Sequence, residues 1–328
     1  NKNLCKALIF AHHSNPHFVI WLEKVKPFMM KSFRISVIFL FPFIQLLKAQ
    51  TATDLWILDT KGKGEKIELD FSTAKPLTNR DLYDNQPSFI NDSELVFSAA
   101  DDKGNHDIIL YSFRTGNFTN LTQTADRSEY SPAITDCKQY ISAVVVEPDG
   151  IQRLWLYPIV EGPAELLYDD IAPVGYYDWV DNRGVLFVLG NPNKLVYVKG
   201  KGDIFEIDTQ VGRSIKKRPN TREITYISNK ESSGNQISNT KWIVAFDLKK
   251  NKTISYGKTV AGSQDLIWMD KNHLLMASGN EFFVRNKYSE EWKSLGKIAS
   301  DSHSTITRLA YSPELNKLIF VMNRNQTQ

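Results

Sequence analysis

The chain has 328 residues, and its 40 Lys and Arg side chains against 37 Asp and Glu give a net charge of +3. The first 49 residues carry seven of the basic side chains and one acidic one, so the charge of residues 50–328 is 3 − 6 = −3. A chain without surplus basic charge is not expected to bind nucleic acid. The 279 residues left are enough for one large β domain.

The N-terminal segment has the pattern of an export signal. Lys31 and Arg34 precede an apolar run of 13 residues from Ile35 to Leu47, and Ala49 follows it. A basic start, a short apolar core and a small residue at the exit are typical of a secretory signal peptide. The run is shorter than the roughly 20 residues that span a bilayer. We therefore predict a signal peptide at Met30–Ala49, an upstream extension that is not native at residues 1–29, and a periplasmic or secreted mature chain without a membrane span.

A pattern returns about every 45 residues in the rest of the chain. Phe89 in Pro87-Ser88-Phe89 corresponds to Ile134 in Pro132-Ala133-Ile134 and then to Trp179, at intervals of 45 residues. The pattern resumes at Trp268, 89 residues later, and at Tyr311, after 43 more. A period of this length, made of short strands and turn residues, is typical of the blades of a β-propeller.

Each copy is predicted to form four antiparallel strands. In the first copy, Pro87–Ile90, Glu94–Ala99, Asp107–Tyr111 and Phe118–Thr122 are separated by turns rich in Asn, Asp and Gly. Second strands are predicted six times, and so are third strands, but the last copy stops after two strands, near Met322. An N-terminal pair, Leu55–Leu58 and Glu65–Leu69, can complete that last blade. The prediction is an all-β, six-bladed propeller over residues 50–328, with the ring closed by pairing the N-terminal strands with the C-terminal blade, so that no open sheet edge remains there.

The stretch from Tyr83 to Ile108 resembles the repeat of the TolB family. It runs from Tyr83-Asp84 through Pro87 and Phe89 to the Phe97-Ser98 strand and the Gly104-Asn105 loop. Parts of the same repeat return in Glu129–Pro132 and Tyr311–Glu314, and the similarity extends over about 54–322. The resemblance implies a six-bladed TolB-like propeller. It does not imply the function of TolB, because we expect this chain to lack the separate N-terminal domain of that protein.

The loops that lead into the innermost strands are the predicted binding surface. In a propeller these loops gather at one mouth of the central channel, and here they are rich in Tyr and in charged residues. Tyr offers contact area at low entropic cost and charges fix orientation, so such a set is suited to holding a protein, a peptide or a cell-envelope partner. The alternative for each side chain is a structural role within the loops. The predicted partner-binding residues are Tyr83, Asp84, Glu129, Tyr130, Tyr176, Tyr177, Asp178, Arg213, Gln264 and His303.

A catalytic function is the alternative to this binding function. Asp84, Glu129 and Asp178 could approach one another and hold a channel metal, as in a lactonase- or glycosidase-like propeller. Against an enzyme, His106, His273 and His303 are the histidines beyond residue 49, and they are not predicted to meet at one metal. The sequence also has no Gly-x-Ser-x-Gly motif. We therefore expect no catalytic residues, no metal and no cofactor, and we expect a monomer.

Overall fold

The computed structural model describes residues 51–230 and 240–325. In these ranges the chain forms 24 β-strands in six four-stranded antiparallel sheets, with one short 3₁₀ turn at Gly64–Lys66. No helix in the described ranges has the length and apolar character of a bilayer-spanning segment. The predicted signal peptide and the upstream extension lie outside the described residues.

Five of the blades are continuous in sequence, and the structure confirms the predicted order of strands within each. Blade 1 contains β3 (Asp84–Phe89), β4 (Glu94–Ala100), β5 (His106–Ser112) and β6 (Phe118–Asn120). Blade 2 contains β7 (Ser128–Ile134), β8 (Tyr140–Val146), β9 (Gln152–Pro158) and β10 (Glu165–Leu167). Blade 3 contains β11 (Val174–Val180), β12 (Arg183–Val188), β13 (Lys194–Gly200) and β14 (Asp203–Thr209). Blade 4 contains β15 (Val211–Lys217), β16 (Glu223–Ser228), β17 (Trp242–Asp247) and β18 (Lys252–Lys258). Blade 5 contains β19 (Leu266–Trp268), β20 (His273–Ser278), β21 (Glu281–Asn286) and β22 (Lys293–Lys297).

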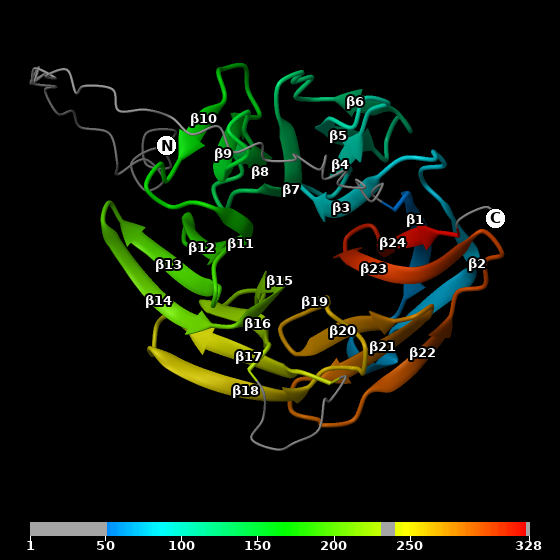
Figure 1. Ribbon diagram of the computed structural model, residues 1–328. Coiled ribbons are helices and arrows are strands. Elements are labelled where there is room, and N and C mark those ends of the chain that lie inside the picture. Colours follow the sequence, from blue (N-terminus) through cyan, green and yellow to red (C-terminus); the bar gives the residue numbers. More distant parts are fainter. Residues whose placement is uncertain (1–50, 231–239, 326–328) are drawn as a thin grey trace, which may run out of the picture. The chain divides into compact units, whose positions relative to one another are not determined.

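Blade 6 closes the ring with strands from both ends of the described chain. It contains β1 (Thr53–Lys61), β2 (Glu68–Pro76), β23 (His303–Ser312) and β24 (Lys317–Arg324), in the spatial order β2-β1-β24-β23. Seven consecutive residue pairs join β1 to β24, and Trp56 lies opposite Phe320. Figure 1 shows the blue β1 beside the red β24. The predicted closure is therefore confirmed.

The outer strand of that predicted pair begins later than expected. Glu65 belongs to the 3₁₀ turn, and β2 starts at Glu68. Gly62 and Gly64 have φ values of 74° and 59°, a left-handed conformation that glycine adopts readily. The 3₁₀ turn at Gly64–Lys66 lies between the two strands, so β2 begins only after Ile67.

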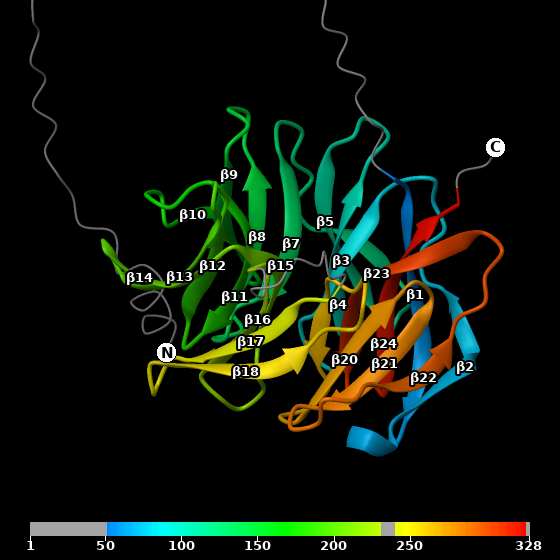
Figure 2. The same cartoon turned by 60° about the horizontal axis from the view of Figure 1, so that its bottom comes forward.

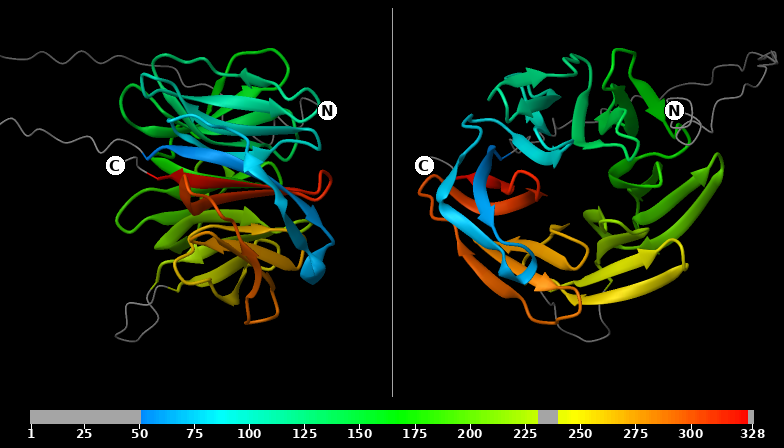
Figure 3. Two further views of the ribbon diagram at one scale, coloured as in Figure 1. Left: turned by 90° about the vertical axis from the view of Figure 1, so that its right-hand side faces the viewer. Right: turned by 180° about the vertical axis from the view of Figure 1, so that it is seen from behind.

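The hydrophobic core is divided among the six interfaces between neighbouring blades. In β24, Leu318 and Phe320 pack toward blade 5, whereas Ile319 and Val321 pack toward blade 1. Alternate side chains of a strand point to opposite faces of its sheet, so each blade contributes to two interfaces. Trp179 lies at the interface of blades 2 and 3 and Trp268 at that of blades 4 and 5, both less than 9% exposed. The turned and rear views show the blades around a common axis (Figures 2 and 3). The strands β3, β7, β11, β15, β19 and β23 are innermost in Figure 1.

A buried carboxylate holds the closing blade together. Asp54, which is fully buried, accepts hydrogen bonds from the backbone amide of Arg80 and the hydroxyl of Thr78. Its other oxygen lies 2.8 Å from Nε2 of His303 and 2.5 Å from Nε of Arg324. The carboxylate thus joins β1 to both C-terminal strands. His303, a predicted partner-binding residue, is 5% exposed and is part of this closure.

Replacing Asp54 with Ala should destabilise the protein by about 3–5 kcal/mol, because Arg324 and His303 would lose the buried acceptor that they share. The matched control is Asp59→Ala in the same strand. Asp59 is half exposed and pairs with Lys317 at 2.6 Å, and its loss should cost less than about 1 kcal/mol. Urea unfolding of both variants measures the difference. Equal losses would show that Asp54 does not hold the closure.

Candidate functional site

Six side chains, one from each blade, form a connected cluster around the axis of the propeller. Tyr83 immediately precedes β3 of blade 1, and Asp265 immediately precedes β19 of blade 5. The other four lie within innermost strands. We name this cluster the axial ring: Tyr83, Tyr130, Tyr176, Arg213, Asp265 and Arg308. Its members are separated by 37 to 52 residues in sequence, so they meet only because the blades form a ring.

The charged half of the axial ring has two guanidinium groups and one carboxylate. Nε of Arg213 lies 3.1 Å from Oδ2 of Asp265, and Nη1 of Arg308 lies 3.0 Å from the same oxygen. Both guanidinium groups also donate to the carbonyl oxygen of Thr307. One net positive charge therefore remains. Burial opposes the charge of Arg308, but Asp265, Tyr176 and Tyr83 outweigh that effect and raise its pKa.

The aromatic half joins blades 1, 2 and 3. The rings of Tyr83 and Tyr130 meet edge to face with centroids 6.5 Å apart, and the hydroxyl of Tyr130 lies 2.9 Å from Nδ1 of His106. The guanidinium of Arg308 lies 5.9 Å from the ring of Tyr176, which connects the two halves. Burial raises the pKa of Tyr83 and of Tyr130, so both hydroxyls keep their protons at neutral pH. Within the described ranges, the hydroxyls of Tyr83 and Tyr176 make no hydrogen bond to the protein.

Breaks in the strand register place several of these side chains. In the innermost strands of blades 2, 3, 4 and 6, the register shifts at or beside Tyr130, Tyr176, Arg213 and Arg308. A β-bulge leaves one residue out of the ladder and changes the direction of its neighbours. Ser131, next to Tyr130, has a φ of 52°, and its backbone amide donates to the side chain of Gln86 in blade 1. The bulges therefore help to turn these side chains toward the axis.

The structure brings together four of the ten predicted partner-binding residues: Tyr83, Tyr130, Tyr176 and Arg213. Gln264 is exposed in the loop before β19, next to Asp265. Asp265, Arg308 and His106 complete the site but were not among the predicted residues. Asp265 lies in a loop that the prediction included, and Arg308 lies three residues before Tyr311, the residue that marks its copy of the repeat. Spacing within the repeat could therefore have identified Arg308.

The other five predicted residues have partners within the fold. His303 contacts Asp54, and Asp84 is fully buried against the guanidinium of Arg80. The hydroxyl of Tyr177 donates to the carbonyl of Ser131 in blade 2. Asp178 accepts from the backbone amides of Trp179 and Lys217 and so joins blades 3 and 4. All five lie within innermost strands, whereas the prediction placed them in the loops that lead into those strands.

Glu129 is a further buried carboxylate with structural partners. It is fully buried and accepts hydrogen bonds from Thr124 at 2.7 Å and Tyr157 at 3.1 Å. Burial raises its pKa, although these hydroxyls act in the opposite direction. In the described part of the chain, no group of three or more His, Cys, Asp or Glu side chains is arranged to hold a metal ion. Asp84, Glu129 and Asp178 thus do not form the carboxylate site of the alternative prediction.

Comparison with known proteins shows the fold. No protein-family model matches the sequence, and no curated protein matches it. A putative TolB from Agrobacterium tumefaciens is 9% identical, covers 85% of this chain and all of its own, and superposes with a TM-score of 0.61. A gluconolactonase from Xanthomonas campestris is 10% identical, with coverages of 82% and 95% and a TM-score of 0.54.

TolB from Acinetobacter baumannii is also similar, at 13% identity over 61% of this chain and with a TM-score of 0.46. The chain spans about half (51%) of the length of that TolB. Identities this low establish the fold and not an activity. The superposition on the putative TolB from Agrobacterium tumefaciens and the six four-stranded sheets confirm the predicted TolB-like six-bladed architecture.

The burial of Glu129 can be tested by comparing the pH dependence of stability of the protein and of its Glu129→Gln variant. Because its folded-state pKa is raised, the folded protein retains this proton to higher pH than the unfolded chain does. The stabilising effect of that proton is lost as the pH rises through the folded pKa. The stability of the unmodified protein relative to Glu129→Gln should therefore decline as the pH rises above about 4.5, the ordinary value for this carboxyl. Chemical unfolding from pH 4 to 8 measures the difference, and a constant difference would contradict the assignment.

Proposed function

We propose that this propeller is a binding module that holds a protein or peptide partner at the mouth of the ring where the loops lead into the innermost strands. The observation that carries the proposal is the axial ring. Tyrosine and arginine side chains from five blades meet there around Asp265 of the remaining blade, and both residue types are enriched among the side chains that dominate binding energy. Several of their donors are not used within the fold.

The charge of the axial ring defines the group that the partner presents. Two guanidinium groups share a single carboxylate oxygen, so the ring has one excess positive charge in a largely buried position. A buried charge is stabilised when an opposite charge and hydrogen bonds accompany it. An acidic side chain or another anionic group of the partner would supply both. The hydroxyls of Tyr83 and Tyr176 are further donors.

An enzyme with a carboxylate-bound metal is less well supported. The three carboxylates of that hypothesis have separate partners in blades 1, 2 and 3. The axial ring instead has a net positive charge, which would repel a metal cation. The likeness to a gluconolactonase is one of fold, and it supplies no site residue.

We further propose that the chain is exported and acts as a monomer. A basic start and a short apolar run at Met30–Ala49 support export. The predicted outcome is a mature protein that begins at Gln50. N-terminal sequencing of the protein recovered from the periplasm or the medium of its native host tests this, and a protein that stays in the cytoplasm at full length would overturn it.

A photo-crosslinking residue at Gln264, which is exposed beside Asp265, should capture a partner in the native host. The matched control is the same residue at Val160, which is 63% exposed in the turn between β9 and β10, a third-to-fourth-strand turn. Such turns lie at the opposite end of a propeller from the mouth. Capture at Gln264 but not at Val160 is the expected result, read by mass spectrometry.

A second substitution shows whether that capture depends on the axial ring. Tyr176→Ala, introduced together with the crosslinker at Gln264, should reduce capture by at least about tenfold, the effect of losing an aromatic anchor. Its melting temperature must stay close to that of the parent protein. Equal capture at both ends of the propeller, or capture that Tyr176→Ala does not reduce, would reject this function.

A further inference from the structure

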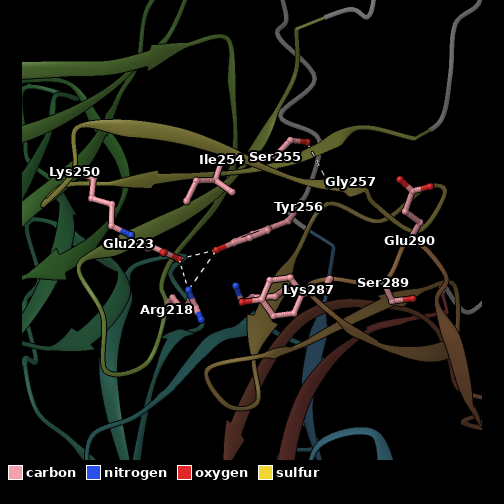
Figure 4. A pocket seen from close by; sticks show the side chains of 11 residues that line it. Arg218, Glu223, Lys250, Ile254, Ser255, Tyr256, Gly257, Lys287, Ser289 and Glu290 are labelled. Atoms are coloured by element: carbon pink, nitrogen blue, oxygen red, sulfur yellow. Dashed lines mark hydrogen bonds and ion pairs between the residues drawn. The ribbon is translucent and has the colours of Figure 1, made fainter.

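A second site lies away from the axial ring, between blades 4 and 5. It is a pocket of about 550 Å³, within the range of roughly 300–1,000 Å³ that small-molecule sites occupy. Its residues come from the turns after β15, β17 and β21, from strand β18 and from Glu223 at the start of β16. First-to-second and third-to-fourth turns lie at the end of a propeller opposite to the mouth. Figure 4 shows the side chains around this pocket.

The wall of the pocket is a preorganised polar network. Nη1 of Arg218 lies 2.7 Å from a carboxylate oxygen of Glu223, and the hydroxyl of Tyr256 donates to the same oxygen at 2.7 Å. Nε of Arg218 donates to the carbonyl of Lys271 at 2.6 Å. The three side chains converge in Figure 4. Because Arg218 and Glu223 neutralise each other, this network fixes the shape of the pocket without adding net charge.

Lys287 adds a positive charge that the protein does not neutralise. The residue is 8% exposed, and its Nζ lies 5.0 Å from the ring of Tyr256 and 3.9 Å from that of Tyr288. Within the described ranges, no carboxylate lies within ion-pair distance of this amino group. Buried lysines are normally paired with an acidic group. An anion in the pocket would supply the missing partner.

Tyr288 gives the pocket an aromatic edge. It is 80% exposed, far more than the other large hydrophobic or aromatic side chains of the described ranges that lie on the surface. An aromatic face carries partial negative charge and attracts the C–H groups of a sugar ring laid against it. Glu290 also lines the pocket and can accept hydrogen bonds from hydroxyl groups. A cation, an aromatic face and a hydroxyl acceptor are thus present together.

We propose that this pocket binds an anionic carbohydrate, a sugar ring that carries a carboxylate or a phosphate. The anionic group lies at Lys287, the ring lies against Tyr288, and ring hydroxyls donate to Glu290. The site is independent of the partner-binding function, because it shares no residue with the axial ring.

Isothermal titration calorimetry with four probes tests the proposal: glucuronate, glucose 6-phosphate, glucose and inorganic phosphate. Glucuronate or glucose 6-phosphate should bind at least about tenfold more tightly than glucose and than inorganic phosphate. The stronger of the two identifies the carboxylate or the phosphate as the anionic group. Binding of inorganic phosphate as tight as that of both anionic sugars would overturn the carbohydrate assignment, and no binding of either anionic sugar would overturn the site.

Variants assign that binding to the pocket. Lys287→Gln should weaken binding of the anionic sugar at least about tenfold, the effect of losing a hydrogen bond to a charged group. Lys252→Gln is the matched control, because Lys252 is exposed at the start of β18 and does not line the pocket. Tyr288→Ala removes an exposed side chain, so it cannot impair folding through lost burial. This variant should also weaken binding of the anionic sugar. Arg308→Gln, in the axial ring, should leave the affinity unchanged. Binding that Lys287→Gln and Tyr288→Ala do not alter would overturn the proposal.

Discussion

The structure depends on the pairing of β1 with β24. Each blade buries alternate side chains against two neighbours, so a blade that lacks one neighbour exposes an entire hydrophobic face. In blade 6, Leu55 and Ile57 pack toward blade 1 while Trp56 and Leu58 pack toward blade 5. The β1–β24 ladder therefore supports two of the six interfaces at once. Asp54 adds an electrostatic link at the same place, with one carboxylate shared by groups from β23 and β24.

The axial ring follows from this closure. Its six members are distant in sequence, and each comes from a different blade, so no blade alone contains a binding site. A ring of side chains held in this way is preorganised, because the positions of the strands fix the distances between its charges. Preorganisation lowers the entropic cost of binding. The guanidinium groups of Arg213 and Arg308 remain close together because Asp265 lies between them.

Much of the fold could be predicted from the sequence, since strand alternation and turn residues are local signals. The repeat gave the number of blades, and the count of second and third strands gave the position of the closure. The candidate site was harder to predict. Asp84, Glu129 and His303 have the residue types of a binding loop, but each is buried against a partner within the fold: Arg80 for Asp84, Tyr157 for Glu129 and Asp54 for His303. Composition does not distinguish a carboxylate that binds a ligand from one that joins two strands.

Arg308 could be identified by its spacing within the repeat but not by alternation along its strand. Alternation assigns each residue of a strand to one face or the other, and this rule fails where the register shifts. β23 shifts register twice before Leu309, so the direction of Arg308 does not follow from its position in the strand. Trp155 in β9 is only partly buried: its indole nitrogen donates to Glu147, and the guanidinium of Arg127 lies over its ring.

The hydrogen bond between Arg324 and Ala52 places both ends of the described chain at one edge of the closing ladder. A mechanical force that separates these two residues would therefore load the rungs of β1–β24 one after another, beginning with Thr53 and Asn323, and not all at once. Antiparallel strands pulled from the same end unzip at low force, whereas strands pulled from opposite ends shear at high force. The propeller thus resists heat and denaturant through all of its blade interfaces, but tension on its two ends would open it at the β1–β24 strand pair alone.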